Sequence, residues 1–378
     1  MRTWIGLMTM PLLACGPAAP PPTIEEAPDV EEPREDQEPP ASALNVEVVD
    51  DPDAVWACDA LGGPTTCAGD YLDLAAVLAP PELDLDACVD GAEQYYVDIV
   101  DGRIPLEEEE DWFPSADELA DRVTEVLGLR EWIDGIDDRP LVLTRRMQRT
   151  HETYVEEEFL VSDPLVGTFE LRFFRPFSDG PVPALIGMPG HPLSDDQTED
   201  FLHEHHGYTY LEHGYAVAVL GFRAYDSGRA EHDAGVSLLC AGSSLTAVKN
   251  YEVLLVHKYL RLLEEQGAVD GVGLIGHSGG SVAGNALIRQ VFDRVDAYVT
   301  DLSSSYMNVQ PCDSRNPRVE CVIDETMPAL YRIHARINDF NNPTLTVPYV
   351  EQEYGYPDGP GEVLDFLDDV LRGGSEEE

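Results

Sequence analysis

Lysine is almost absent from this chain of 378 residues, since it occurs only as Lys249 and Lys258. Nearly all of the positive charge is therefore arginine, and 23 basic residues face 73 acidic ones, for a formal net charge of -50. A surface this acidic repels phosphate backbones, which argues against a nucleic-acid partner. Net charge bears on solubility rather than on fold, so we interpret the acidity as a solubility feature.

Long apolar runs are also lacking. The run Trp4–Leu13 follows Arg2 and is too short for a stable helix across a bilayer, which is typical of a signal peptide. It leads into LLACG at 12–16, which resembles the bacterial lipobox, whose cysteine is acylated after cleavage. We expect residues 1–15 to be a lipoprotein signal peptide and Cys15 to tether the exported protein to the cell envelope, on its periplasmic or extracellular face. The alternative is an ordinary signal peptide with a chance cysteine. No later stretch is predicted to span a membrane.

Six cysteines follow Cys15, and an even number in an exported chain predicts disulfides. They are Cys58, Cys67, Cys88, Cys240, Cys312 and Cys321. Six cysteines allow 15 complete pairings. The spacing favours Cys312 with Cys321, because that bond would close one local loop, but the sequence leaves the other pairings open.

Composition divides the remainder of the chain into three parts. Residues 16–52 are rich in proline and glutamate and hold few apolar residues, so they are predicted to be a disordered acidic tether. Residues 53–139 are predicted to form an N-terminal helical extension or cap, including a helix that begins near Ser115 with Glu118 as its capping partner. Residues 140–372 alternate predicted strands and helices.

This alternation predicts an α/β fold with a mostly parallel central sheet and helices on both of its faces. Two long segments at 141–161 and 167–177 are predicted to be paired strands. The other predicted strands are 183–190, 215–222, 272–275, 293–303 and 328–339, and the predicted helices are 196–214, 245–267, the one after Ser278, and 361–371.

The stretch GHSGG at 276–280 fits the pattern G-x-S-x-G. Alone the pattern is weak, but here it follows an apolar strand and precedes a helix, which is the strand-turn-helix setting that gives it meaning. Glycines remove side chains that would collide in so tight a turn, so that the Ser278 hydroxyl projects from the sheet. The amide of Gly279 would then face developing negative charge, and the amide of His191, in the loop after the 183–190 strand, is the candidate second donor. The bland alternative is a structural serine in a glycine-rich turn.

In these motifs the chain from about 140 to 371 resembles the α/β-hydrolase superfamily, in the branch of acetyl xylan esterase-like and dienelactone hydrolase-like enzymes. The matching stretches are PALIGMPGH, LEHGYAVAVLGFRAYD, VDGVGLIGHSGGS and RVDAYVTDLSS. The resemblance implies an α/β-hydrolase fold and a serine-dependent carboxylic-ester hydrolase with no cofactor.

The resemblance places the catalytic acid near Asp339, with Asp301 as the alternative, and a solvated loop aspartate as the bland interpretation of each. It places the catalytic histidine just before the last helix, but Tyr354-Gly355-Tyr356 stands there and no histidine follows His334. His334, His191 or another histidine is therefore the candidate base, since such triads are defined by geometry rather than by chain order. A further alternative is a slow site without a histidine, which acts through the oxyanion hole and positioning alone. His277 is set aside, because the residue before an elbow serine points away from the reacting face.

A metal site is not predicted. His203 and His206, with Glu199 one turn earlier, could ligate zinc from one helix face, but the spacing is not H-E-x-x-H. The sequence thus predicts an envelope-anchored esterase that acts on a small-molecule or polysaccharide ester through Ser278. The alternative is a catalytically impaired surface binding protein on the same fold.

Overall fold

The structure is a computed structural model of the whole chain, and it describes residues 44–91, 116–127, 130–191, 196–225, 229–290, 294–301, 347–352 and 359–373. The sequence-based predictions that fall outside these ranges include the signal peptide with the lipid site at Cys15, the Cys312–Cys321 pair, the strand at 328–339, His334 and Asp339. Within them, no helix has the length and apolar character needed to cross a bilayer.

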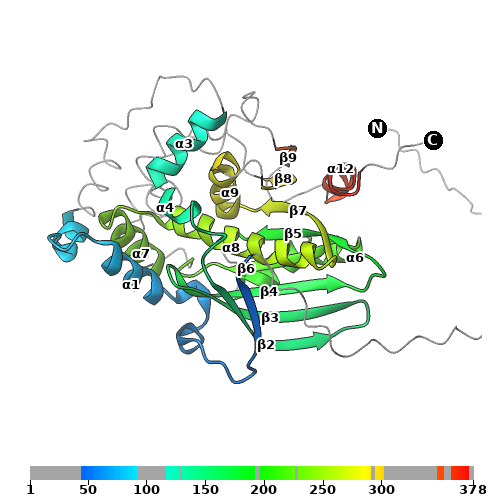
Figure 1. The fold of residues 1–378 in the computed structure, drawn as a ribbon, viewed down its shortest axis with the longest axis horizontal. Coiled ribbons are helices and arrows are strands. Elements are labelled where there is room, and N and C mark those ends of the chain that lie inside the picture. Colours follow the sequence, from blue (N-terminus) through cyan, green and yellow to red (C-terminus); the bar gives the residue numbers. More distant parts are fainter. Residues whose placement is uncertain are drawn as a thin grey trace, which may run out of the picture. The chain divides into compact units, whose positions relative to one another are not determined.

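In the described part of the chain, nine strands form one sheet (Figure 1). They are β1 (Val46–Asp50), β2 (Leu141–Thr150), β3 (Tyr154–Asp163), β4 (Gly167–Pro176), β5 (Val182–Met188), β6 (Ala216–Gly221), β7 (Val269–Gly276), β8 (Ala297–Thr300) and β9 (Tyr349–Glu351). The order across the sheet is β1-β2-β3-β4-β6-β5-β7-β8-β9. Five of the eight neighbouring pairs are parallel, and the three antiparallel pairs join β2, β3, β4 and β6 in succession.

The described helices are α1 (Gly69–Leu78), α3 (Ala116–Leu127), α4 (Arg130–Ile133), α5 (Gln197–Glu204), α6 (Gly207–Glu212), α7 (Arg229–Cys240), α8 (Leu245–Glu265), α9 (Gly279–Gln290) and α12 (Gly361–Leu371), with 3₁₀ turns at Ala57–Leu61 and Pro64–Thr66. The helix α8 begins at a conventional cap, because the Ser244 hydroxyl accepts a hydrogen bond from the amide of Ala247 at 3.0 Å.

Apolar residues cover both faces of the sheet, and β6 shows how one strand serves two cores. Ala216, Ala218 and Leu220 pack in one cluster with residues of α7, α8 and α9. Val217 and Val219 point the other way and pack with residues of α5, α6 and α12. A strand buried on both faces needs apolar residues at every position, which explains the unbroken apolar sequence AVAVLG.

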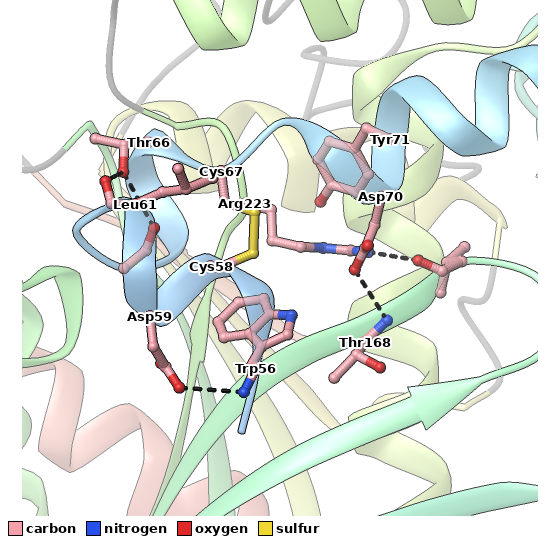
Figure 2. The surroundings of a disulfide bond; sticks show 12 residues. Trp56, Cys58, Asp59, Leu61, Thr66, Cys67, Asp70, Tyr71, Thr168 and Arg223 are labelled. Atoms are coloured by element: carbon pink, nitrogen blue, oxygen red, sulfur yellow. Dashed lines mark hydrogen bonds and ion pairs between the residues drawn. A yellow bond between two sulfur atoms is a disulfide. The ribbon is translucent and has the colours of Figure 1, made fainter. Parts of the chain in front are cut away.

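The N-terminal extension packs on the main domain through a buried arginine. Arg223, just after β6, has no exposed surface, pairs with Glu252 of α8, and pairs with Asp70 of α1 at 3.0 Å. Its guanidinium lies 4.2 Å from the ring centre of Tyr71. Figure 2 shows this arginine beside the disulfide between Cys58 and Cys67. Charged groups buried this deeply must pair with one another, so α1 is fixed to the core.

Two elements differ from the sequence-based prediction. Val46–Asp50, assigned to the tether, forms β1, because its backbone pairs in parallel with Leu141–Arg145. The predicted helix 196–214 is two helices, α5 and α6, because His206 adopts φ 63° between them, a left-handed conformation that a continuous helix cannot contain. The predicted helix at 245–267 and the final helix at 361–371 are confirmed as α8 and α12.

Candidate active site

The candidate nucleophile lies in a strained turn. Strand β7 ends at Gly276, helix α9 begins at Gly279, and Ser278 between them has φ 50°, a backbone conformation that costs a non-glycine residue energy. Its side chain is partly exposed at the carboxyl end of the parallel strands, where open α/β sheets bind ligands. The structure thus confirms the predicted strand-turn-helix setting of the GHSGG motif.

Glycines around this serine are required by close backbone approach. A Cβ at Gly280 would lie 2.0 Å from the Met188 carbonyl oxygen, and one at Gly276 would lie 2.7 Å from the Cα of Ser281. A Cβ at Gly190 would lie 2.6 Å from the Ser278 Cβ. The loop after β5 therefore rests directly against the nucleophile turn. The sheet order, the parallel strands and this elbow together decide the architecture. The chain has the α/β-hydrolase fold.

A buried carboxylate holds the turn from the inner side. Asp301, directly after β8, accepts hydrogen bonds from the Ser278 amide at 2.9 Å and from the Ser281 hydroxyl at 3.0 Å, and it also bonds Nδ1 of His277. Burial alone would raise the pKa of Asp301, but the hydrogen bond from His277 and the other donors hold that pKa below its usual value. The ionised carboxylate therefore accepts from all three groups.

A second histidine lies behind the first. The ring of His205, at the end of α5, stacks on the His277 ring with centroids 3.4 Å apart. Burial, followed by the proximity of His277, lowers the pKa of His205 to about 4. A neutral His205 can lie against His277 without charge repulsion. Both rings are buried, so they lie on the inner side of the turn.

The loop after β5 continues into a cluster of charged groups. His191 Nε2 lies 2.8 Å from Oε2 of Glu231 on α7, and Lys249 Nζ of α8 lies 3.3 Å from the other oxygen of the same carboxylate. The Tyr225 ring lies 4.2 Å from the His191 ring, centre to centre, and 3.4 Å from Lys249 Nζ. Burial favours a raised pKa for Glu231, but the charge of Lys249 and the bond with His191 lower it.

The sequence-predicted site residues are thus partly assembled. Ser278 and Gly279 lie in the elbow, and His191 follows the glycine that packs on Ser278. Asp301, the alternative acid, is not a solvated loop residue, because its carboxylate is buried and bonds the Ser278 amide. Among the described residues, no imidazole is hydrogen-bonded to the Ser278 hydroxyl.

The histidine cluster on α5 does not assemble as the sequence suggested. Nε2 of His203 lies 3.4 Å from a carboxylate oxygen of Glu199, but the helix ends before His206, so the three side chains do not share one helix face. The described part of the chain contains no group of three histidine, cysteine, aspartate or glutamate residues that could hold a metal ion.

Sequence analysis did not identify Glu231 or Lys249 as site residues. A glutamate in the first turn of a helix normally indicates a solvated helix start, so Glu231 gave no signal. Lys249 did give a signal, because it is one of only two lysines in the chain and both are buried in α8. A residue type that is avoided on the surface but kept in the interior points to a specific partner.

No family model matches the chain, and no curated protein matches it in sequence. Solved structures do match the chain in fold. They include a protein of Bacteroides fragilis assigned as an acetyl xylan esterase, with 15% identity, coverage of 69% of this chain and 74% of that one, and a TM-score of 0.45. A methylesterase has 18% identity, coverage of 75% and 69%, and a TM-score of 0.44. Acetyl xylan esterase from Paenibacillus sp. R4 has 10% identity, coverage of 72% and 99%, and a TM-score of 0.42.

Proposed function

We propose that the protein is a serine-dependent carboxylic-ester hydrolase that acts on a small-molecule or polysaccharide ester. One observation carries the proposal: Ser278 is held in a left-handed conformation at the strand-helix elbow. The residue is partly exposed, and no described residue is hydrogen-bonded to its hydroxyl. Strain of this kind persists only where the surrounding structure maintains it, and it concentrates at functional sites. Here Asp301 and the packing of Gly190 maintain it.

In this mechanism the Ser278 oxygen attacks the ester carbonyl and its proton passes to a base. The carbonyl oxygen becomes an oxyanion, which the amides of Gly279 and His191 stabilise. The alcohol leaves with a proton, and water then releases the carboxylic acid and restores the serine. His334 is the proposed base and Asp339 the proposed acid that orients it. No step in this route requires a cofactor.

A catalytically impaired binding protein is the second candidate. The observation in its favour is that the residues described around Ser278 supply no hydrogen-bonded imidazole, and a serine without a base reacts slowly. A binding protein would retain the fold and the elbow but lose turnover.

Ester turnover separates these two functions. We expect purified protein to hydrolyse p-nitrophenyl acetate, and Ser278→Ala to lower kcat by at least about 10³-fold, as the loss of a nucleophile does. Ser178→Ala, a change at an exposed loop serine, is the matched control and should leave kcat unchanged. Equal turnover in wild type and Ser278→Ala would eliminate the nucleophile assignment. Absence of turnover in every variant would favour the binding protein.

We further propose that the protein is exported and anchored at the envelope through a lipid on Cys15. The disulfides Cys58–Cys67 and Cys88–Cys240 support export, because such bonds persist in oxidising compartments. In a bacterial host that processes lipoproteins, wild type should fractionate with membranes and Cys15→Ala should become soluble. Membrane association of Cys15→Ala would contradict the anchor.

A further inference from the structure

The charged cluster beside the elbow is unusual in its depth. Glu231 has no exposed surface, Lys249 is 3% exposed, and their charged groups lie 3.3 Å apart between α7 and α8. Burying an ion pair gains little stability, because the desolvation penalty offsets much of the attraction and an apolar pair of similar size would serve as well. A stability role alone therefore does not account for it, and its better-attested use is to fix one geometry.

The His191 side chain connects this cluster to the candidate site. His191 leaves the loop after β5 and bonds Glu231 at 2.8 Å, and its ring packs on Tyr225. About a quarter of the His191 side chain is exposed, so the imidazole lies at the boundary between the buried charges and the open side of the elbow. The Tyr225 ring also lies against the ammonium of Lys249, so the same tyrosine contacts both His191 and Lys249, the two partners described for the carboxylate.

The backbone that precedes this histidine is the part that touches the nucleophile. Gly190 packs so closely on Ser278 that even one added carbon would collide with it. The next amide is that of His191, the proposed second oxyanion donor. Oxyanion stabilisation depends on donors held in advance at the right distance, and a displacement of about 1 Å can cost on the order of 10²-fold in rate.

We propose that Glu231 and Lys249 act as a positioning pair: Lys249 holds the Glu231 carboxylate, and Glu231 bonds the His191 imidazole and thereby holds the His191 amide at the oxyanion site beside Ser278. The inference rests on the proposed function and deepens it. Glu231 and Lys249 are positioning residues in this account, because they act through His191 and touch no reacting atom. Nothing in this role requires His191 to accept the serine proton.

Two substitutions at His191 separate this role from that of a base. In His191→Ala the backbone amide of residue 191 remains, but the side-chain bond to Glu231 that anchors the loop is lost. In His191→Gln the side-chain amide can donate to Glu231 from nearly the position of Nε2, yet it cannot act as a base. The matched control is His213→Ala, which removes another histidine–carboxylate pair, that with Asp368 at 3.1 Å. His213 lies just before the amino end of β6, whereas the elbow lies at the carboxyl end of β7.

The assay is steady-state hydrolysis of p-nitrophenyl acetate, together with the rate of phosphonylation by a fluorophosphonate. We expect His191→Ala to lower kcat and the phosphonylation rate on the order of 10–100-fold with little change in KM, and His191→Gln to restore both to within about threefold of wild type. His213→Ala should match wild type. Wild-type rates in His191→Ala would overturn the proposal. Equal loss in the alanine and glutamine variants would also overturn it, and would assign the imidazole to proton transfer.

Hydrogen exchange provides a readout that does not depend on turnover. Backbone amides of the segment around 187–191 should exchange faster in His191→Ala than in wild type, and exchange in His191→Gln should stay close to wild type. Unchanged exchange in His191→Ala would overturn the proposal that the bond between His191 and Glu231 anchors this loop. If wild type shows neither turnover nor phosphonylation but exchange behaves as expected, the ester-hydrolase function fails and the anchor stands as a device that fixes the loop.

Discussion

The Asp301 carboxylate organises the elbow at the scale of single residues. It accepts from the Ser278 amide, the Ser281 hydroxyl and the His277 ring while almost fully buried. Asp301→Asn keeps the size but turns an amide group toward a donor, so we expect a loss of about 2–3 kcal/mol in the free energy of unfolding and slower reaction of Ser278. Urea unfolding measures the first quantity.

The control is Asp121→Asn, because Asp121 pairs with Arg130 on the surface and both side chains are more than half exposed. That change should stay within about 0.5 kcal/mol of wild type. An Asp301→Asn protein as stable as the control would show that the carboxylate does not hold the turn.

Gly280 has no room for a side chain. A methyl group there would meet the Met188 carbonyl oxygen at 2.0 Å, so Gly280→Ala must displace either the helix start or the loop after β5. We expect a loss of about 3 kcal/mol or more in stability, and loss of Ser278 reactivity in whatever folded protein remains. Thermal unfolding provides the measurement.

Gly180→Ala is the matched control, since an added carbon there meets no atom within 4 Å. Its melting temperature should equal or slightly exceed that of wild type. A Gly280→Ala protein with the same melting temperature as Gly180→Ala would contradict the close approach at the elbow.

Single residues also show how far the candidate site could be predicted from the sequence. The GHSGG motif predicted the position of Ser278 because the constraint is local: a strand, a turn and a helix within a few residues. The partners of Asp301 could not be predicted, because the sequence left Asp301 either a catalytic acid or a solvated loop residue. Its actual role depends on β8 lying beside β7, which only the folded sheet establishes.

At the scale of elements, the hairpins of β2, β3 and β4 carry a network of charges. Glu170 on β4 is 17% exposed and bonds Arg146 on β2 at 3.2 Å. Burial, reinforced by Glu158 and opposed by the arginines, raises the pKa of Glu170 to about 7. A pKa that is higher in the folded state than in the unfolded state means that folding favours the protonated form. The associated stability is present below about pH 4.5 and is lost as the pH rises through about 7.

Glu170→Gln should therefore be more stable than wild type at pH 8–9, by at most on the order of 2–3 kcal/mol, and the difference should shrink as the pH falls toward about 4.5. Melting temperatures measured from pH 5 to 9 for both proteins test this. Glu47→Gln, on the exposed part of β1, is the control. A difference that is constant across this pH range would rule out titration of Glu170 as the cause.

The elements were predicted to the extent that their signals were local. The unbroken apolar strands β5, β6 and β7 and the long helix α8 all appeared in the sequence. β1 was missed because its residues are half exposed and derive their strand pairing from β2, nearly a hundred residues away. The break between α5 and α6 was missed because histidine is a weak signal for the left-handed conformation that His206 adopts, and positive φ is uncommon even for histidine.

At the scale of the whole molecule, two disulfides constrain the N-terminal extension. Cys58–Cys67 spans 9 residues, whereas Cys88–Cys240 spans 152 and joins the extension to the end of α7. Longer loops restrict the unfolded chain more. Replacing both Cys88 and Cys240 by serine should therefore cost about 5 kcal/mol, against roughly 2–3 kcal/mol for the shorter bond.

Denaturant unfolding of the two double variants measures these costs, and alkylation without prior reduction checks that the four cysteines are paired. Ready alkylation of Cys88 or Cys240 in folded, unreduced protein would contradict the bond. Because Cys240 ends the helix that carries Glu231, loss of the longer bond should also slow reaction at Ser278.

The central claim is that the elbow presents one reactive serine to solvent. Intact-protein mass spectrometry after treatment with a fluorophosphonate tests it most directly, with the adduct located by peptide mapping. The account predicts a single adduct per chain, on the peptide that contains Ser278, and none in Ser278→Ala. An unmodified wild-type protein, or an adduct that persists in Ser278→Ala, would contradict it.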